Sequence, residues 1–511
     1  MYHSRARSAH LSRLRQRTVA GALIASLAAP VIALGSASPA FAAAGDLDTT
    51  FNTTGILEAD LLNIRGVGGG CENCVDKGRA VAVQPDGKVV VVGEFGGDRA
   101  GWYALRRNAD GTPDTTFSGD GLYTSPTTNG DALGVAVQSD GKIVVVGGLA
   151  NGDFFAARLT TAGVLDPAFN GGAIKSIALG GSAGADMAFD VKIDSNGKIV
   201  LAGQVDAEII QNEAPFFASN GPSSQVGVVR LNSDGSNDTS FGSGGIAVAN
   251  GGDGNFLSGG VGIFGRGLAL DSSNRPIVVG YLANQYSCCT PGETAIRVGV
   301  GVYRFGVNGS APTVSDKYES QSTMTEAYDV TVQSTGRIVV AGTKNTGSSY
   351  DFAILGLDPT TFQPDTAFGS SGARTLDFAG DSDSALAVTV DSSDRIVAGG
   401  QTGANWDPAV ARFTATGAVD TAFGTNGFRT NAIAGGVKAR AYGVDVAPNG
   451  RIQALWQQLQ ELQASNSNPN SAPYRAKARD ILTNVDFWLN ENKLQASMGT
   501  RVHRVLDPVV N

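Results

Sequence analysis

Histidine, the side chain most often used for acid–base chemistry near neutral pH, is scarce in this chain. Its 511 residues include three histidines, His3 and His10 near the start and His503 near the end. We therefore expect no Ser-His-Asp or Cys-His site, and no histidine-ligated zinc, in the long region between them. Paired carboxylates remain an option, because two Asp or Glu side chains suffice to cleave a glycosidic bond. No acidic pair differs from its repeated neighbours, so the sequence assigns no catalytic residue.

Two turns place side-chain oxygens at alternating positions, as calcium-binding loops do. They are NADGTPD, with Asn108, Asp110 and Asp114, and NSDGSND, with Asn232, Asp234 and Asp238. Neither turn continues into the twelve-residue loop that ends on a bidentate Glu. Because Asp and Asn before Gly are common turn formers, we interpret both segments as turns. We expect no metal site and no cofactor; a structural calcium ion is the less favoured alternative.

The first 42 residues have the three zones of a secretory signal peptide. Five arginines precede an apolar run from Val19 to Leu34, and Ala40-Phe41-Ala42 follows it. We expect segment 1–42 to be removed, which leaves a mature chain that is secreted, periplasmic or at the cell surface. Its removal takes the formal charge from −9 to about −14. So acidic a chain is a poor partner for nucleic acid or an anionic membrane.

No later apolar run is long enough to span a bilayer. An extracellular protein or a glycan is the partner that we expect, and the sequence predicts no oligomeric state.

The four cysteines form two close pairs, Cys71 and Cys74 in CENC and the adjacent Cys288 and Cys289. An exported protein meets oxidising conditions, which favour disulfides over free thiols. We expect a local bridge within each pair. A redox role is not favoured, because no βαβ pattern surrounds the CENC motif.

Most of the chain repeats one hairpin phrase. It reads VAVQPDGKVVVVG at 81, VAVQSDGKIVVVG at 135, VKIDSNGKIVLAG at 191, LALDSSNRPIVVG at 268, VTVQSTGRIVVAG at 330, VTVDSSDRIVAGG at 388 and VDVAPNGRIQALW at 444. A second phrase follows the same period, as in DTTFSGDG at 114 and DPAFNGG at 166, and a third, such as FFAARLTTAG at 154, lies between them. Each unit thus predicts four short strands.

The hairpin strands are apolar on both faces, so both faces must be covered by neighbouring sheets. Seven sheets arranged radially cover every face and leave short edges. We therefore predict an all-β fold, a seven-bladed β-propeller of four-stranded antiparallel blades over residues 43–452. We expect the N-terminal LDTTFNTTGILEADLL to supply the outer strand that closes the ring. A β-sandwich array or a β-solenoid is the alternative.

The phrases DFFAARL, QSDGKIVVVG and LDPAFNGG resemble the delta-60 repeat family of bacterial exported proteins, over about residues 46 to 452. The resemblance implies a propeller-like architecture and no catalytic residue. Two positions depart from the pattern. Asn274-Arg275-Pro276 replaces the Gly turn of the fourth unit, and Gly356 stands where the third unit has Arg158.

Polar residues that recur in most units are expected to serve the fold, through ion pairs within a blade or turn hydrogen bonds. They are Arg158, Arg230, Arg304 and Arg412; Asp153, Asp351 and Asp407; and Asp114, Asp166, Asp238, Asp365 and Asp420.

The long insertions, 61–78, 205–225, 250–264 and 281–297, all join strands on one face of the predicted ring, whereas the opposite face carries only short turns. Because binding residues concentrate on loops held by a rigid scaffold, the inserted face is the candidate ligand-binding face, although loops also vary in length without function. Polar and aromatic residues unique to one blade there are Phe216, Phe217, Tyr286, Arg297 and Tyr350.

The repeat ends after Ile452, and residues 453–511 contain a single Gly. Leu455, Trp456, Leu459 and Leu462 recur at helical spacing, which predicts a helical tail over 453–511. Helices that cover an incomplete last blade, helices that mediate association, and a segment of foreign origin are all open interpretations.

Two functions remain. The first is a non-catalytic binding or surface-interaction propeller whose ligand the sequence does not identify. The alternative is a secreted carbohydrate-active hydrolase or lyase that uses carboxylates on the inserted face.

Overall fold

The structure is a computed structural model. It describes residues 50–52, 77–94, 101–125, 130–179, 185–207, 225–249, 262–287, 294–320, 322–347, 349–378, 382–403, 406–430, 438–446 and 452–459. The chain divides into two compact units, Met1–Phe41 and Ala42–Asn511, and every described residue belongs to the second. The expected signal peptide 1–42 therefore lies outside the described residues and stays a prediction.

The strands are short and follow one another in sets of four. Blade 1 holds β1 (Lys77–Val83), β2 (Val89–Glu94), β3 (Trp102–Arg107) and β4 (Leu122–Thr124). Blade 2 holds β5 (Gly130–Val137), β6 (Ile143–Leu149), β7 (Phe154–Leu159) and β8 (Lys175–Ile177). Blade 3 holds β9 (Ala185–Ile193), β10 (Ile199–Ala207), β11 (Gln225–Leu231) and β12 (Ile246–Ala249).

Blades 4 to 6 repeat this plan. Blade 4 holds β13 (Gly262–Leu270), β14 (Pro276–Ser287), β15 (Thr294–Arg304) and β16 (Lys317–Ser320). Blade 5 holds β17 (Glu326–Val332), β18 (Ile338–Asn345), β19 (Tyr350–Leu357) and β20 (Ala373–Leu376). Blade 6 holds β21 (Ser384–Val390), β22 (Ile396–Thr402), β23 (Asp407–Phe413) and β24 (Phe428–Thr430). The last sheet holds β25 (Lys438–Val446) and β26 (Ile452–Leu459), and two short 3-10 turns lie at Asn170–Gly172 and Val314–Asp316.

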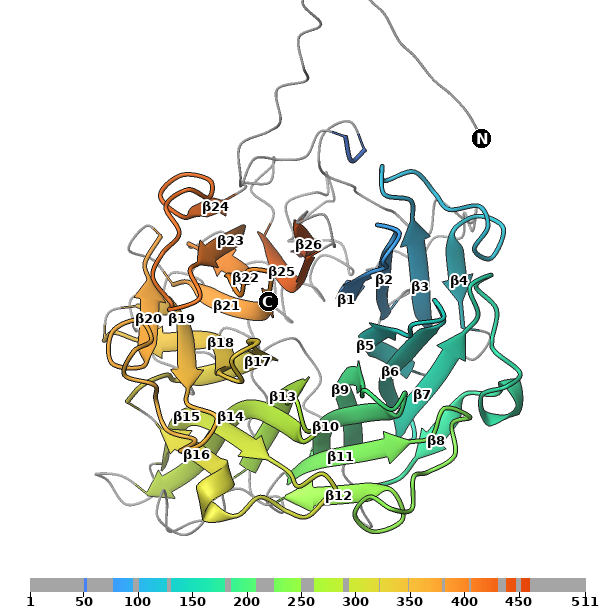
Figure 1. The fold of residues 1–511 in the computed structure, drawn as a ribbon, viewed down its shortest axis with the longest axis horizontal. Helices are drawn as coiled ribbons and strands as arrows, with labels where there is room; N and C mark the ends of the chain where they lie inside the picture. The colour runs from blue at the N-terminus through green and yellow to red at the C-terminus, as the bar shows by residue number, and fades with distance from the viewer. Residues whose placement is uncertain are drawn as a thin grey trace, which may run out of the picture. The chain divides into compact units, whose positions relative to one another are not determined.

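The sheets form a closed ring. Within each sheet, strands that follow one another in the chain pair antiparallel. The first strand of each blade contacts the first strand of the next blade, and β25 contacts β1. First strands therefore surround the axis and fourth strands form the rim (Figure 1). This arrangement is a β-propeller, as the repeat predicts, and not a sandwich array or a solenoid.

The prediction of seven four-stranded blades needs correction. Six sheets have four strands, and the seventh has two among the described residues, β25 and β26.

The predicted helical tail is also wrong where it is described, because Ile452–Leu459 is strand β26. Its backbone pairs with β25 from Lys438↔Leu459 to Val446↔Ile452. A strand partner presented by the ring overrides a helical spacing read from four apolar residues. Residues 460–511 lie outside the described part of the chain.

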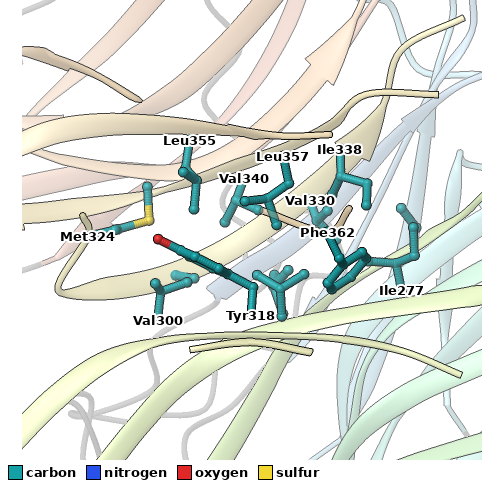
Figure 2. Packing of buried hydrophobic residues seen from close by; sticks show 14 of the residues in the cluster. Ile277, Val300, Tyr318, Met324, Val330, Ile338, Val340, Leu355, Leu357 and Phe362 are labelled. Atoms are coloured by element: carbon teal, nitrogen blue, oxygen red, sulfur yellow. The ribbon is translucent and has the colours of Figure 1, made fainter. Parts of the chain in front are cut away.

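Both faces of the hairpin strands are covered, as their composition predicts. Ile143, Val144, Val145 and Val146 are all fully buried. Val145 packs in the cluster shared with blade 1, whereas Val144 and Val146 pack in the cluster shared with blade 3. Burial of one such side chain is worth about 1.5–3 kcal/mol, so each junction between blades is a core of its own. Figure 2 shows the junction of blades 4 and 5, where Ile277, Val300 and Tyr318 pack in one cluster with Val340, Leu355 and Phe362.

The last glycine of the hairpin phrase is required by a β-bulge. In blade 4 the pairing of β13 with β14 shifts between Gly265 and Gly267, which leaves Arg266 as the extra residue. A Cβ added at Gly280 on β14 would lie 1.9 Å from the carbonyl oxygen of Phe264. Only glycine fits there. The bulge redirects the side chain of its extra residue, which matters for the site below.

Candidate functional site at one end of the ring

The repeated arginines and the aspartates that pair with them lie at the end of the ring that carries the short turns, and they are structural. The repeated aspartates Asp153, Asp351 and Asp407 lie at the other end, where the third strands begin. Arg158 Nε donates to Asp166 Oδ2 at 2.8 Å, and the guanidinium lies 4.9 Å from the centre of the Phe169 ring. Arg158 Nη1 also donates to the carbonyl oxygen of Ser233 in blade 3. One side chain thus ties its own blade together and joins it to the next.

The same pairing recurs as Arg106–Asp114, Arg230–Asp238, Arg304–Asp316 and Arg412–Asp420. Burial would raise the pKa of Asp238, but hydrogen bonds from Ser240, Lys198 and Arg230 hold it well below its usual value. These carboxylates are therefore ionised partners of the arginines and not general acids.

Blade 5 replaces its missing arginine from another strand. Gly356 stands at the arginine position, where an added Cβ would lie 2.5 Å from the Phe368 ring. Arg337, at the start of the second strand, instead donates from Nε to Asp365 Oδ2 at 2.8 Å and lies 5.5 Å from the centre of the same ring. The ion pair survives although the sequence pattern is broken.

The oxygen-rich turns are occupied by hydrogen bonds. Asp110 Oδ1 accepts from the backbone nitrogen of Thr112 at 2.9 Å, and Asp114 Oδ1 accepts from that of Thr116 at 3.0 Å. Asp153 accepts from Asn151 at 2.8 Å, and Asp351 accepts from Thr346 at 3.3 Å. Among the described residues, no group of three or more His, Cys, Asp or Glu side chains could hold a metal ion. These aspartates therefore make the hydrogen bonds within turns that the sequence predicts.

The structure places two of the five candidate ligand-face residues in strands. Tyr286 lies opposite Ala295 in the β14–β15 ladder, and Arg297 lies opposite Asn284. Much of the predicted insertion 281–297 is therefore a longer hairpin; the side chains of these two residues are not described. Phe216, Phe217 and all four cysteines lie outside the described residues, so the expected bridges stay predictions.

Tyr350, the fifth candidate, belongs to a group of polar and aromatic side chains at the opposite end of the ring from the short turns. We call this group the mouth cluster; its members are Arg266, Tyr281, Glu326, Tyr328 and Tyr350. Glu326 is the first residue of β17, and Tyr328 is the extra residue of the bulge that follows it. Arg266 is the extra residue of the matching bulge in blade 4. Two bulges thus bring the ends of blades 4 and 5 together.

The contacts within the mouth cluster are short and specific. Tyr328 donates its hydroxyl proton to Glu326 Oε2. The Arg266 guanidinium lies 4.5 Å from the centre of the Phe189 ring and 5.9 Å from that of Tyr281. The Tyr281 ring stacks on Phe264 with 4.7 Å between centroids.

The mouth cluster has buried and accessible members. Glu326 and Tyr281 are buried, whereas Arg266, Tyr328 and Tyr350 keep part of their surface exposed. Burial, and then the charge of Glu326, raises the pKa of both Tyr328 and Tyr350. Both tyrosines therefore remain neutral hydrogen-bond donors at any physiological pH.

Three carboxylates and one lysine meet at the ring axis. We call Asp190, Lys192, Asp329 and Asp445 the axial cluster. They come from the first strands of blades 3 and 5 and of the last sheet, and the charges of the three carboxylates act on Lys192. Each carboxylate joins two sheets through backbone nitrogens. Asp329, for example, accepts from Val330 and from Val388 of blade 6, both at 2.8 Å. Asp445 likewise accepts from Val83 of blade 1 at 2.8 Å.

The axial charges influence one another. Lys192 Nζ lies 2.8 Å from Asp190 Oδ2, and 41% of its side chain remains accessible, so solvent reaches this part of the axis. Burial and the neighbouring Asp190 charge raise the pKa of Asp329 to about 7. Burial would lower the pKa of Lys192, but the charges of Asp190, Asp329 and Asp445 raise it.

A third polar group lies in blade 1. Glu94 is 3% exposed and accepts from Arg79 Nη2 at 2.9 Å, with Lys77 Nζ also at 2.9 Å. Burial would raise the pKa of Glu94, but the charges of Arg79 and Lys77 lower it to about 2. This carboxylate is a fixed anion within its own ion pairs.

The comparison with protein families supports the fold. Four stretches, 84–117, 138–169, 216–241 and 392–423, match a family described as "Domain of unknown function (DUF5122) beta-propeller". The chain is a β-propeller repeat protein. The matched stretches lie in blades 1, 2, 3 and 6 of this propeller. No curated protein matches the chain.

Solved structures share the architecture at low similarity. Sqt1 from Chaetomium thermophilum is 13% identical, with 77% of the propeller chain and 97% of Sqt1 covered at a TM-score of 0.40. The PQQ-bound aldose sugar dehydrogenase from Streptomyces coelicolor is 13% identical, with coverage of 66% and 94% and a TM-score of 0.35. The polysaccharide lyase Uly1 is 13% identical, with coverage of 74% and 89% and a TM-score of 0.35. None of them carries an activity to this chain.

Sequence reasoning found Tyr350 but missed the other members of both clusters. Their signal is a polar residue inside a first strand where other blades have small or apolar ones. Asp190 and Asp329 stand where blades 2 and 4 have Gly134 and Gly267. Arg266 and Tyr328 stand where blades 2 and 6 have leucine, whereas blade 1 has Arg79 and the last sheet has Tyr442 at this position. In the described part of the chain no helix is long and apolar enough to cross a membrane.

Proposed function

We propose that the protein is an exported propeller of the delta-60 repeat type that binds a glycan at the mouth cluster without turning it over. The observation that supports this most is the contrast between the two ends of the ring. At the short-turn end the polar side chains repeat from blade to blade and are engaged in ion pairs. At the other end the polar and aromatic side chains vary more from blade to blade. Tyr281 stands where blade 2 has Gly148, and Glu326 stands where blade 4 has Phe264. The bulge residues Arg266 and Tyr328 have counterparts in Arg79 of blade 1 and Tyr442 of the last sheet.

The chemistry of the mouth cluster suits a sugar. Tyr328 and Tyr350 offer partly exposed rings that can stack on the apolar face of a pyranose. The Tyr350 hydroxyl can donate a hydrogen bond to the sugar, whereas the Tyr328 hydroxyl, whose proton goes to Glu326, can accept one. The Arg266 guanidinium supplies further donors in a fixed plane. Glu326 accepts from Tyr328 and so holds that ring in one orientation. Binding without reaction follows because this carboxylate is held by its neighbour and no second carboxylate belongs to the cluster.

The axial cluster favours the second candidate, a carbohydrate-active hydrolase or lyase. Asp329 has a pKa of about 7 and lies beside a second carboxylate, Asp190, so two carboxyl groups stand close together at the axis. Against it, each of these carboxylates accepts backbone N–H groups from two blades, which is a structural task.

A glycan array, followed by incubation of each bound glycan with the protein and analysis of the products, distinguishes the two functions. We expect binding that Tyr328→Phe weakens about tenfold, and no product. A cleaved glycan, with cleavage abolished by Asp329→Asn, would establish the hydrolase or lyase instead.

Export is tested separately by sequencing the N-terminus of the mature protein, which we expect to begin at Ala43.

A further inference from the structure

A hollow lies between blades 1 and 2 at the short-turn end, away from the mouth cluster. Its volume is about 510 Å³, and Gln84, Lys88, Arg106, Asp140 and Thr161 contribute to its lining. A water molecule takes up ~30 Å³ in the liquid, so the hollow has room for a ligand and not only for bridging water. Sequence patterns do not predict a site here, because the turns at this end repeat.

Other junctions fill the corresponding place with a peptide carbonyl. Arg230 Nη1 donates to the carbonyl oxygen of Val307 at 2.7 Å, and Arg304 Nη1 donates to that of Pro359 at 2.7 Å. Arg337 Nη1 donates to the carbonyl oxygen of Ala415 at 2.9 Å. In each case an arginine of one blade binds the outer turn of the next blade.

The glutamine of the hairpin turn completes this arrangement. In blade 5, Gln333 Oε1 accepts from Arg337 Nη1 at 3.1 Å, and its Nε2 donates to the Ala415 carbonyl at 3.0 Å. In blade 2, Gln138 Oε1 accepts from Arg158 Nη1 at 3.3 Å. Both ends of the carboxamide are thus satisfied where the junction is closed.

The junction of blades 1 and 2 leaves both groups without these partners. Arg106 bonds within its own blade, from Nε to Asp114 Oδ2 at 2.7 Å and from Nη2 to Thr116 Oγ1 at 3.3 Å. No hydrogen bond in the described part of the chain joins it to Thr161, which occupies the place of Ala415. The Gln84 side chain is 5% exposed, and its Nε2 donates to the Gly141 carbonyl oxygen of blade 2 at 3.5 Å. Its Oε1 is buried and has no hydrogen-bond partner among the residues that the structure describes.

A buried acceptor with no donor is rare in folded proteins, and it indicates a missing partner. The partner must donate to Gln84 Oε1 and can accept from Arg106 Nη1. The charges around the hollow balance, since Lys88 and Arg106 face Asp86 and Asp140. A neutral amide meets these requirements better than an anion does.

We propose that this hollow binds the backbone of an extended peptide segment from another protein. The peptide carbonyl accepts from Arg106 Nη1, in the place that a turn carbonyl holds at the closed junctions. The peptide N–H donates to Gln84 Oε1. The site is independent of the glycan proposal, because it lies at the other end of the ring and uses different residues.

The test titrates an uncharged capped tetrapeptide, N-acetyl-tetraalanine amide, into the full chain while the NMR shift of the Gly141 amide, which also lines the hollow, is followed. We expect saturable binding that Gln84→Ala weakens at least tenfold and that Thr161→Trp abolishes by filling the hollow. Gln333→Ala is the matched control, because its carboxamide is already satisfied within the protein; we expect it to leave binding unchanged. Thermal melting confirms that each variant is folded.

Maltotriose, a neutral ligand with hydroxyls in place of amides, is titrated in parallel. Binding of the sugar but not of the peptide overturns the proposed ligand class. Peptide binding that is equal in the wild type and Gln84→Ala overturns the proposed site, as does the absence of saturable shifts with either probe.

Discussion

Aspartate serves three different ends in this protein, and its surroundings decide which. Asp110 caps an exposed turn through the backbone nitrogen of Thr112. Asp114 is buried beside Arg106 and stays ionised through that pair and its hydrogen bonds. Asp329 at the axis is close to Asp190, and burial together with that like charge raises its pKa to about 7. Hydrogen bonds from Thr112 lower the pKa of Asp110, whereas burial is the main cause that raises the pKa of Asp329.

The raised pKa of Asp329 predicts a loss of stability with rising pH. The folded protein holds a proton on this carboxyl that an unfolded chain loses near pH 4. Its contribution to the free energy of unfolding is therefore full below about pH 4 and is lost as the pH rises through about 7. Urea titrations at pH 5 and pH 8 measure this effect. Between these two pH values the wild type should lose about 1–2 kcal/mol more of its free energy of unfolding than Asp329→Asn does, because solvent at the axis screens part of the interaction.

Asp110→Asn is the control for this measurement, because its carboxyl lies in an exposed turn. Between pH 5 and 8 it should follow the wild type. Parallel pH profiles for the wild type and Asp329→Asn would contradict the assigned environment of Asp329.

At the scale of the element, blade 5 keeps the ion pair of the other blades, although its arginine comes from a different position in the chain. Arg337 starts from the second strand, yet its guanidinium reaches the same aspartate and aromatic ring as the third-strand arginines do. It also donates to the carbonyl of Ala415 in blade 6. The pair is largely buried, with side-chain exposures of 16% and 20%.

Arg337→Ala should therefore lower the free energy of unfolding by about 2–4 kcal/mol, because it leaves Asp365 without its partner and opens the junction to blade 6. Arg275→Ala is the matched control. Arg275 pairs with Asp271 four residues away and is 36% exposed, so about 0–1 kcal/mol is expected. Urea denaturation of both variants measures the difference, and equal losses would contradict the assigned role of Arg337.

The strands and their pairing could be predicted from the sequence because each one repeats. Alternating turns and apolar runs gave hairpins, and apolar residues on both faces predicted covered sheets, as Val144 and Val145 confirm. Strand β26 could not be predicted, since its residues have helical spacing and only pairing with β25 makes them a strand. The mouth cluster could not be predicted either, because bulges at Arg266 and Tyr328 determine where these side chains point.

At the scale of the whole molecule, the ring must be closed between β25–β26 and blade 1. The Asn52 backbone nitrogen donates to the Asp110 carbonyl at 2.7 Å, and Phe51 is buried. Ser118, Asn170, Gly242 and Gly369 make the same contact with the following blade in the rest of the ring. Thr50–Asn52 therefore takes the place that the second repeated phrase, such as DTTFSGDG at 114, holds in the other units. This is expected for an N-terminal segment that closes the ring. The outer strand expected after it lies outside the described residues.

Phe51→Ala should open the ring locally. We expect faster amide hydrogen exchange in β1 and β25, which corresponds to a loss of about 2–4 kcal/mol of local stability. Exchange in blade 4 should be unchanged. The equivalent Phe241→Ala should instead accelerate exchange where blades 3 and 4 meet, because Phe241 packs in their shared cluster. Hydrogen exchange with mass spectrometry reads both, and uniform acceleration in Phe51→Ala would contradict local closure by this segment.

The most direct test of the account is calorimetric titration of an array-selected glycan into the wild type, Tyr328→Phe and Tyr303→Phe. Both tyrosines donate to a glutamate, Tyr328 to Glu326 in the mouth cluster and Tyr303 to Glu319 at 2.6 Å between β15 and β16. Binding at the mouth cluster predicts that Tyr328→Phe raises Kd about tenfold while Tyr303→Phe leaves it unchanged. Equal affinity in the wild type and Tyr328→Phe would contradict the proposed binding site.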